Sequence, residues 1–171
     1  MLFHVSEAAD LSRFDPRPSD CTANPVVWAI DGERLRNYLL PRDCPRVTFY
    51  ARSQTTVADK DRLLGVASAV VAIEEGWLER VRRCRLYCYH LPPATFECID
   101  ECAGYFVSPV PVLPKRVDIF DDVISELQRR NVEIRILPNL WPLRDAVVAS
   151  SLQFSIIRMR NALPRTNAIL T

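Results

Sequence analysis

The sequence predicts an α+β fold with a mixed or antiparallel sheet at its core, folded as a single domain over residues 1–171. Short segments in the first two thirds of the chain alternate apolar and polar residues, which is the pattern of half-buried strands. Two later segments, residues 117–130 and 143–162, space their apolar residues as amphipathic helices do. No glycine-rich loop of the P-loop or dinucleotide-binding type is present, which argues against a doubly wound domain.

The first part of the chain reads as strands joined by one helix. Asp31 is a suitable N-cap for that helix, and the proline-bracketed segment 41–45 ends it. The expected elements are strands at Leu2–Ser6, Pro25–Ile30 and Arg46–Ala51 and a helix at Glu33–Leu40.

The middle of the chain continues this alternation. We expect a helix over Asp59–Ala69, a strand over Ala69–Ile73, a short helix after Gly76, and strands over Arg85–Leu91 and Tyr105–Val112. Pro109 and Pro111 fall on one side of the last strand, so it lies at a sheet edge or bends there.

The last third predicts a helix–strand–helix ending. A helix over Val117–Arg130 would bury Ile119, Val123, Ile124 and Leu127, and Asn131 would follow it as the C′ residue. A strand over Val132–Leu137 and a helix over Leu143–Ala162 complete the chain.

Composition narrows the class of protein. A chain of 171 residues with 49% hydrophobic and 25% charged residues can bury a sizeable core. No apolar run is long enough to cross a membrane, and the first residues lack a signal-peptide pattern, so we expect a cytoplasmic protein that does not enter a membrane. The net charge of +1 gives no general attraction to nucleic acid. An oligomeric state does not follow from these features.

The six cysteines favour free thiols over a metal site. Cys84 and Cys88 lie in or beside an expected strand, where four residues span about 13 Å, too far for one ion to bind both. Cys98 and Cys102 come close only if their segment is helical. We therefore assign no metal ligand.

The two histidines have different interpretations. His90 shares a strand face with Cys88 and is typical of a hydrogen-bonded structural histidine. His4 lies two residues before Ser6 at the end of the first strand, where a polar pair often faces a cleft. Capping of backbone groups explains His4 equally well at this point.

Arginines are the other candidate ligand-binding residues. They are unusually frequent, since only Lys60 and Lys115 among the 22 basic residues are lysines. The guanidinium group suits bidentate pairing with carboxylates and phosphates. Arg42 lies in the proline-bracketed loop and Arg144 in the first turn of the last helix, each followed by an aspartate. These residues act either as structural ion pairs or as a pocket for a phosphate-bearing ligand.

Several segments resemble a family of small uncharacterised bacterial proteins, a domain of unknown function, over nearly the whole chain. The segments that carry this resemblance are residues 2–7, 14–17, 27–31, 41–47, 140–146 and 155–161. This resemblance implies no activity.

A second resemblance is to ADP-ribosyltransferase-like domains of the histidine-containing class. It rests on His4 in the first strand, Tyr38 after the second strand, the Tyr87/Tyr89 strand, and residues 105–112. The resemblance implies an NAD cofactor contacted by the histidine and stacked on a tyrosine, either Tyr38 or Tyr50. The class also places a glutamate near a late strand; here the residue before Tyr105 is Gly104, and the nearest upstream acid is Glu101.

Two hypotheses follow. In the first, the chain transfers or hydrolyses the glycosidic bond of NAD, with a carboxylate stabilising positive charge on the ribose. Its catalytic residues are His4 and Glu101, and its cofactor-binding residues are Ser6, Arg17, Trp28, Tyr38, Arg42, Tyr50 and Arg144. In the second, a non-enzymatic domain binds a phosphorylated metabolite or a protein partner through arginine and tryptophan surfaces. The sequence leaves open whether the protein is an enzyme.

Overall fold

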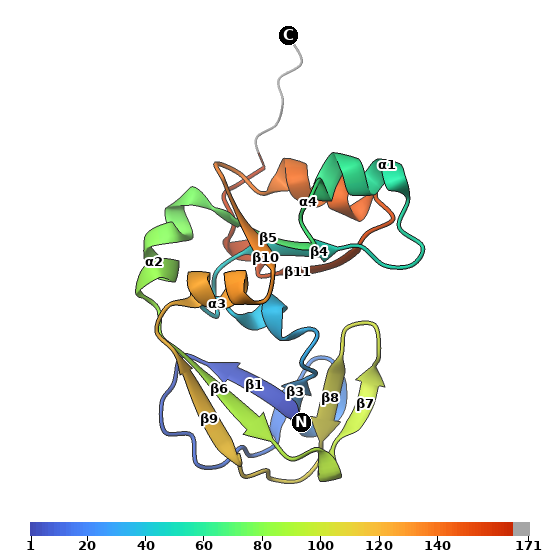
Figure 1. The fold of residues 1–171 in the computed structure, drawn as a ribbon. Coiled ribbons are helices and arrows are strands. Elements are labelled where there is room, and N and C mark those ends of the chain that lie inside the picture. The colour runs from blue at the N-terminus through green and yellow to red at the C-terminus, as the bar shows by residue number, and fades with distance from the viewer. Residues whose placement is uncertain (166–171) are drawn as a thin grey trace. The chain divides into compact units, whose positions relative to one another are not determined.

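The structure, a computed structural model, describes residues 1–165 and confirms the α+β class (Figure 1). Over these residues it forms a seven-stranded and a four-stranded sheet. The chain groups into two compact units, each made from two chain segments. Unit 1 comprises Met1–Arg42 and Cys84–Val123, and unit 2 comprises Asp43–Arg83 and the chain from Ile124 onward. That the whole chain folds as one domain stays a prediction.

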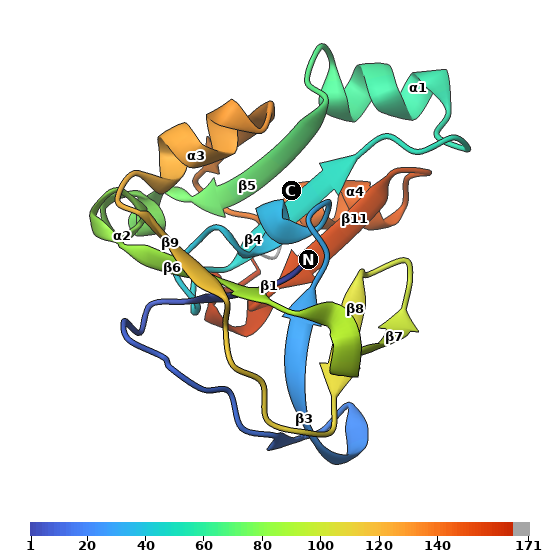
Figure 2. The same cartoon turned by 60° about the horizontal axis from the view of Figure 1, so that its bottom comes forward.

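Unit 1 is a curled antiparallel sheet with the strand order β7-β8-β3-β1-β6-β9, and β2 pairs with β3 (Figure 2). Its strands are β1 (Leu2–Ser6), β2 (Arg17–Ser19), β3 (Thr22–Ile30), β6 (Leu86–Leu91), β7 (Glu97–Asp100), β8 (Tyr105–Ser108) and β9 (Arg116–Phe120). Two 3₁₀ helices, η1 (Leu35–Tyr38) and η4 (Pro93–Thr95), complete it.

The core of unit 1 lies on one face of this sheet. Leu2 in β1, Ala29 in β3 and Tyr89 in β6 point to the same side because successive residues of a strand alternate between faces. Phe14 and Val112 close over that side, and their backbones exchange hydrogen bonds of 2.8 and 2.9 Å. The first strand was predicted with its full extent, and its alternation is what places His4 on this core face.

Unit 2 is built on a sheet with the order β10-β5-β4-β11, in which β10 and β5 are parallel and the other pairs antiparallel. Its strands are β4 (Arg46–Tyr50), β5 (Ala69–Glu74), β10 (Val132–Leu137) and β11 (Gln153–Ile157). Its helices are α1 (Val57–Asp59), the π-helical η2 (Lys60–Leu64), η3 (Glu75–Trp77), α2 (Leu78–Arg83), α3 (Val123–Arg129, which starts at the end of unit 1), α4 (Trp141–Val148) and η5 (Met159–Asn161).

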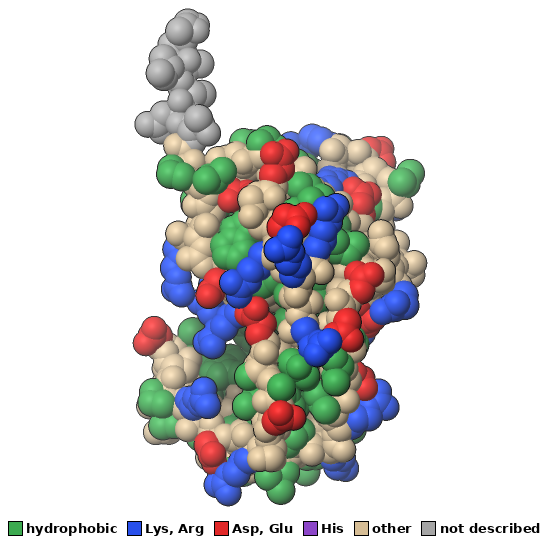
Figure 3. All heavy atoms as spheres, turned by 90° about the vertical axis from the view of Figure 1, so that its left-hand side faces the viewer, with side chains coloured by type: hydrophobic (Ala, Val, Ile, Leu, Met, Phe, Trp, Pro, Cys, Tyr) green, Lys and Arg blue, Asp and Glu red, His purple; other side chains and the backbone are tan. Residues whose placement is uncertain are grey.

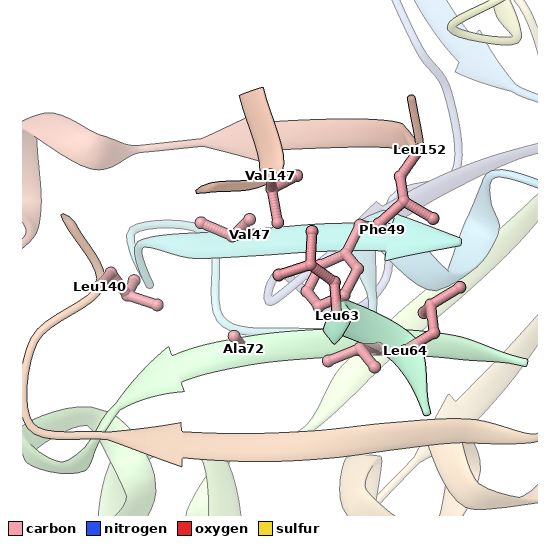
Figure 4. Close-up of a cluster of buried hydrophobic side chains, with 9 residues drawn as sticks. Val47, Phe49, Leu63, Leu64, Ala72, Leu140, Val147 and Leu152 are labelled. Carbon is pink, nitrogen blue, oxygen red and sulfur yellow. The ribbon is translucent and has the colours of Figure 1, made fainter. Parts of the chain in front are cut away.

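The core of unit 2 fills one face of its sheet. Val47 and Phe49 from β4 meet Leu63 and Leu64 from η2 and Val147 from α4 (Figure 4). All five side chains are buried. Burial of large aliphatic and aromatic side chains in one cluster is the main stabilising contribution expected for a unit of this size.

The predicted helix over Val117–Arg130 is wrong in its first part. Residues 116–120 form β9, which pairs with β6, and the helix α3 begins only at Val123. Ile119 is consequently exposed, whereas Val123 and Leu127 are buried as predicted. The apolar spacing of residues 116–120 fits a short strand as well as a helix, and pairing with β6 selects the strand. The predicted C′ residue, Asn131, has the left-handed φ of 57° that this position favours.

The predicted helix over Leu143–Ala162 is also wrong after its first two turns. The helix α4 ends at Val148, and residues 153–157 form β11 beside β4. Ser150 stops the helix, because its hydroxyl donates to the Val147 carbonyl at 2.7 Å and accepts from Leu152 N–H at 3.2 Å. The helix–strand–helix order α3, β10, α4 is present, with an additional strand after it.

Smaller differences have local causes. The helix expected at Glu33–Leu40 is the 3₁₀ turn η1, and Asp31 accepts from Arg34 N–H at 2.8 Å just before it. The strand expected at Tyr105–Val112 ends at Ser108, directly before Pro109, which lacks the N–H that a ladder needs. The strands β2 and β7 were not predicted.

Candidate functional site

His4 is half-buried in β1, and its ring is fixed from two sides. Its Nδ1 lies 3.0 Å from the carbonyl oxygen of Trp28, and its ring packs against Phe14 with centroids 4.8 Å apart. Because a carbonyl can only accept, Nδ1 carries the hydrogen of this bond. In the neutral ring this leaves the lone pair on Nε2.

Burial lowers the pKa of His4 below its usual 6.5, and the hydrogen bond to Trp28 opposes that effect. The positive charges of Arg42 and Arg17 lower the pKa further. His4 is therefore a neutral imidazole at pH 7. Arginine charge near a neutral polar ring attracts an anionic group and repels a cation.

The residues near the end of β1 hold this region by backbone contacts. Ser6 Oγ accepts from Ala8 N–H at 3.0 Å, so this predicted ligand residue shapes the turn after β1. Glu7, which the sequence did not single out, accepts from Arg42 N–H at 3.1 Å. Arg17 lies on β2 opposite Val26, and this pairing places its exposed side chain on the sheet face that carries Trp28, not on the His4 face.

Trp28 and His4 do not share a face of the sheet. Phe3 pairs with Ile30, so Trp28 lies on the Phe3 face, whereas His4 lies on the face that carries Phe14. Only the backbone carbonyl of Trp28 reaches the histidine. The predicted site residues of unit 1 therefore fall into two groups, one on each face.

The second group is aromatic. The Trp28 ring meets the Tyr105 ring edge-on at a centroid distance of 5.7 Å, and the Tyr38 hydroxyl donates to the Tyr105 hydroxyl at 2.9 Å. Tyr105 completes this cluster and was noted in the sequence only as part of a strand motif.

Glu101 lies in the turn between β7 and β8, with its side chain exposed. Its backbone carbonyl accepts from Arg34 Nη2 at 3.1 Å. The neighbouring Gly104 has a φ of 67°, and a Cβ added there would lie 2.6 Å from Asp31 Oδ2. A glutamate directly before Tyr105 is thus disfavoured by the backbone conformation and by the contact with the Asp31 side chain.

The remaining predicted site residues belong to unit 2. Tyr50 ends β4, opposite Gln153 in β11. Arg144 lies in α4, donates to Asp145 at 2.9 Å and has its guanidinium carbon 6.0 Å from the centroid of the Trp141 ring. Arg144 therefore pairs with its own neighbour Asp145 rather than with another element, and Asp145 also pairs with Arg165.

The other histidine and the cysteines are described by the contacts in their own surroundings. His90 Nε2 lies 2.7 Å from Asp118 Oδ2, which confirms a hydrogen-bonded histidine. Arg116, which pairs with the same carboxylate, holds the pKa of Asp118 below its usual value, and His90 contributes. Across residues 1–165, none of the six cysteines forms a disulfide, and no three metal-ligating side chains gather.

The charges on the surface and the lengths of the helices are consistent with the composition. Basic and acidic side chains are interspersed on the face shown in Figure 3, as the net charge of +1 suggests. Within the described part of the chain, no helix is long and apolar enough to cross a membrane.

The comparisons with known proteins identify a family and no activity. Neither the curated proteins nor the solved structures include a match to this chain. A family of unknown function, DUF6886, matches residues 3–162, nearly the whole chain, in agreement with the first resemblance noted in the sequence. The chain belongs to this family of unknown function, DUF6886.

Proposed function

We propose that the chain binds a phosphate-bearing small molecule at the His4 face of unit 1, with NAD⁺ as the first candidate. The observations that carry this proposal are the half-buried His4, held through Nδ1 by the Trp28 carbonyl, and the positive charge of Arg42 acting on it. A guanidinium group binds phosphate oxygens bidentately, so Arg42 can hold a phosphate of the ligand.

The chemistry of His4 fits an uncharged part of such a ligand. With Nδ1–H committed to the Trp28 carbonyl, Nε2 accepts a hydrogen bond from a ribose hydroxyl or an amide. The adjacent Phe14 ring is buried and fixes the orientation of the imidazole. Trp28 and Tyr38 lie with Tyr105 on the other face, so we assign them to that aromatic cluster rather than to the His4 site.

The geometry favours a protein that binds the ligand without transferring or hydrolysing any part of it. Glycosidic-bond chemistry on NAD needs a carboxylate at the ribose, and Gly104 occupies the position where the related class places it. Glu101 is the acid that the enzymatic hypothesis requires. A Glu101→Gln variant separates the two: it abolishes turnover if the chain is a transferase or hydrolase, and it leaves ligand binding intact under our proposal.

Isothermal titration of the full chain with NAD⁺, ADP-ribose and inorganic phosphate tests the proposal. We expect saturable binding of NAD⁺ or ADP-ribose that weakens about tenfold in Arg42→Ala, the loss of about one charge-assisted contact. His4→Asn should also weaken binding, because the amide can replace Nδ1–H but offers no acceptor at the Nε2 position.

His90→Asn is the matched control, since it changes the other histidine of unit 1, on the opposite sheet face. This variant should bind as the wild type does. No heat with any of the three ligands from a folded sample, or an equal loss in His90→Asn, would contradict a phosphate-binding site at His4.

A further inference from the structure

A short segment at the end of the described chain is held in an extended form against unit 2. Residues 163–165 contact the end of β5, the loop after β10, and the first turns of α4. The family match ends at residue 162, directly before this segment. The surface that holds it therefore lies in the matched part of the chain, whereas the segment does not.

Glu74 binds the backbone N–H at the start of the segment. This glutamate is the last residue of β5 and is only 2% exposed. Its carboxyl oxygens accept from Leu163 N–H at 3.0 and 3.2 Å, and one of them also accepts from Leu140 N–H at 3.2 Å. A buried carboxyl group needs such donors, so Glu74 forms a receptor for peptide N–H groups.

The carbonyls of the next two residues accept from side chains. Trp141 Nε1–H donates to the Leu163 carbonyl at 2.7 Å, and Asn139 Nδ2 donates to the Pro164 carbonyl at 3.2 Å. Pro164 has no N–H and needs no acceptor there. The surface thus recognises the backbone of an extended peptide with proline at its second position.

Arg165 adds recognition of a side chain. Its two terminal nitrogens pair with the two carboxylate oxygens of Asp145, each at 3.0 Å. Its guanidinium carbon lies 4.3 Å from the centroid of the Trp141 ring, a cation–π distance. A bidentate pair combined with an aromatic platform favours arginine over lysine.

We propose that Glu74, Asn139, Trp141 and Asp145 form a docking site for an extended Leu-Pro-Arg peptide, and that its resident ligand is the chain's own segment 163–165. Leu163 itself is 53% exposed, so the segment is bound by its backbone and by Arg165 rather than as part of the core. Such a segment exchanges with an equivalent peptide supplied in trans.

Limited trypsin digestion of the full chain tests the occupancy of the site. We expect cleavage after Arg165 to be slow in the wild type and about tenfold faster in Asp145→Asn, because the loss of a bidentate charge-assisted contact raises the population of the open segment. The thermal midpoint should be unchanged. Asp61→Asn, at an exposed aspartate of the same unit, is the matched control and should digest as the wild type does. Unchanged cleavage in Asp145→Asn overturns the proposal.

A chain that ends at Ala162 tests exchange directly. It should fold, as judged by circular dichroism, and bind a synthetic peptide of residues 162–171 saturably, while a peptide with Arg165→Ala binds at least tenfold more weakly. A shortened chain that fails to fold overturns the proposal, because the segment is then part of the core. Protection from trypsin that depends on protein concentration also overturns it, since the segment would then come from a second copy.

Discussion

At His4, burial and two neighbouring arginines lower the pKa, and this makes stability depend on pH. The unfolded chain takes up a proton near pH 6.5, whereas the folded chain takes it up only at lower pH. This contribution to stability is therefore complete above pH 6.5 and is lost as the pH falls from 6.5 through the folded-state pKa, by at most about 1.4 kcal/mol per pH unit.

His4→Asn removes the titration and keeps a donor for the Trp28 carbonyl. We expect the difference in unfolding free energy between wild type and variant to shrink as the pH is lowered from 7 to 5. Urea unfolding at several pH values measures this difference. A difference that stays constant over this range would show that the imidazole titrates alike in the folded and unfolded chains.

Gly104 provides a second prediction at the residue scale. Gly104→Ala places a Cβ 2.6 Å from Asp31 Oδ2 at a φ of 67°, so it should destabilise unit 1 by at least about 1–2 kcal/mol from the backbone conformation alone. Gly76→Ala is the control, because no atom lies within 4 Å of the added Cβ. Denaturant midpoints of the two variants test the prediction, and equal midpoints would refute it.

Among the elements, α1 is attached to Ser151 through the carboxylate of Asp59 and through Thr55 and Thr56 just before it. Asp59 accepts from Ser151 N–H at 2.8 Å and Ser151 Oγ–H at 2.7 Å, and it also pairs with Arg62. The Ser151 backbone bond, followed by the other two, holds the pKa of Asp59 well below its usual range.

Asp59→Asn should therefore lower the thermal midpoint at pH 7 and speed amide exchange in residues 57–64. A carboxylate with a lowered pKa contributes stability above its unfolded-state pKa, and this is lost as the pH falls through the folded value. The effect of the variant should consequently fade in strong acid. Equal exchange rates in wild type and Asp59→Asn would mean that α1 is held by other contacts.

The boundary between β9 and α3 yields a paired prediction. Leu127→Ala removes a fully buried side chain and should cost about 2–5 kcal/mol, whereas Ile119→Ala, at a side chain 55% exposed, should stay within about 0.5 kcal/mol. Urea unfolding compares the two. Similar costs would favour the continuous buried helix that the sequence spacing predicts.

This boundary also shows which elements local sequence patterns do not predict. Strands such as β1 and β10 were predictable because alternation and flanking turn residues agree over their whole length. Residues 116–120 and 153–157 carry apolar spacings that fit either a helix or a strand, and their partners in β6 and β4 decided the outcome. Pairings between residues distant in the chain are not encoded in local periodicity.

For the molecule as a whole, the same limit applies to the candidate site. His4, Arg17 and Arg42 were predicted as site residues from residue type and position, and the strand pairing of Arg17 places it on the opposite sheet face from His4. Trp28 could join this site only if its side chain lay on the same sheet face. The face follows from the strand register, and composition does not reveal that register. Tyr50 and Arg144 belong to the other compact unit, a division that the sequence showed no linker to suggest.

The two units nevertheless should unfold together, because neither is a continuous piece of chain. In unit 1, β1 from the first segment pairs with β6 from the second, and in unit 2, β5 pairs with β10 in the same way. The chain crosses between the units three times, so neither unit is complete until both of its segments are in place. Cooperative unfolding is the rule for chains near this length.

Two variants that each keep a single tryptophan test this prediction. One keeps Trp28 in unit 1 and the other keeps Trp77 in unit 2. We expect their fluorescence to change at the same urea concentration, and to coincide with circular dichroism of the same samples. Two separate midpoints would instead divide the chain into two folding domains, and a ligand at His4 would then raise only the midpoint reported by Trp28.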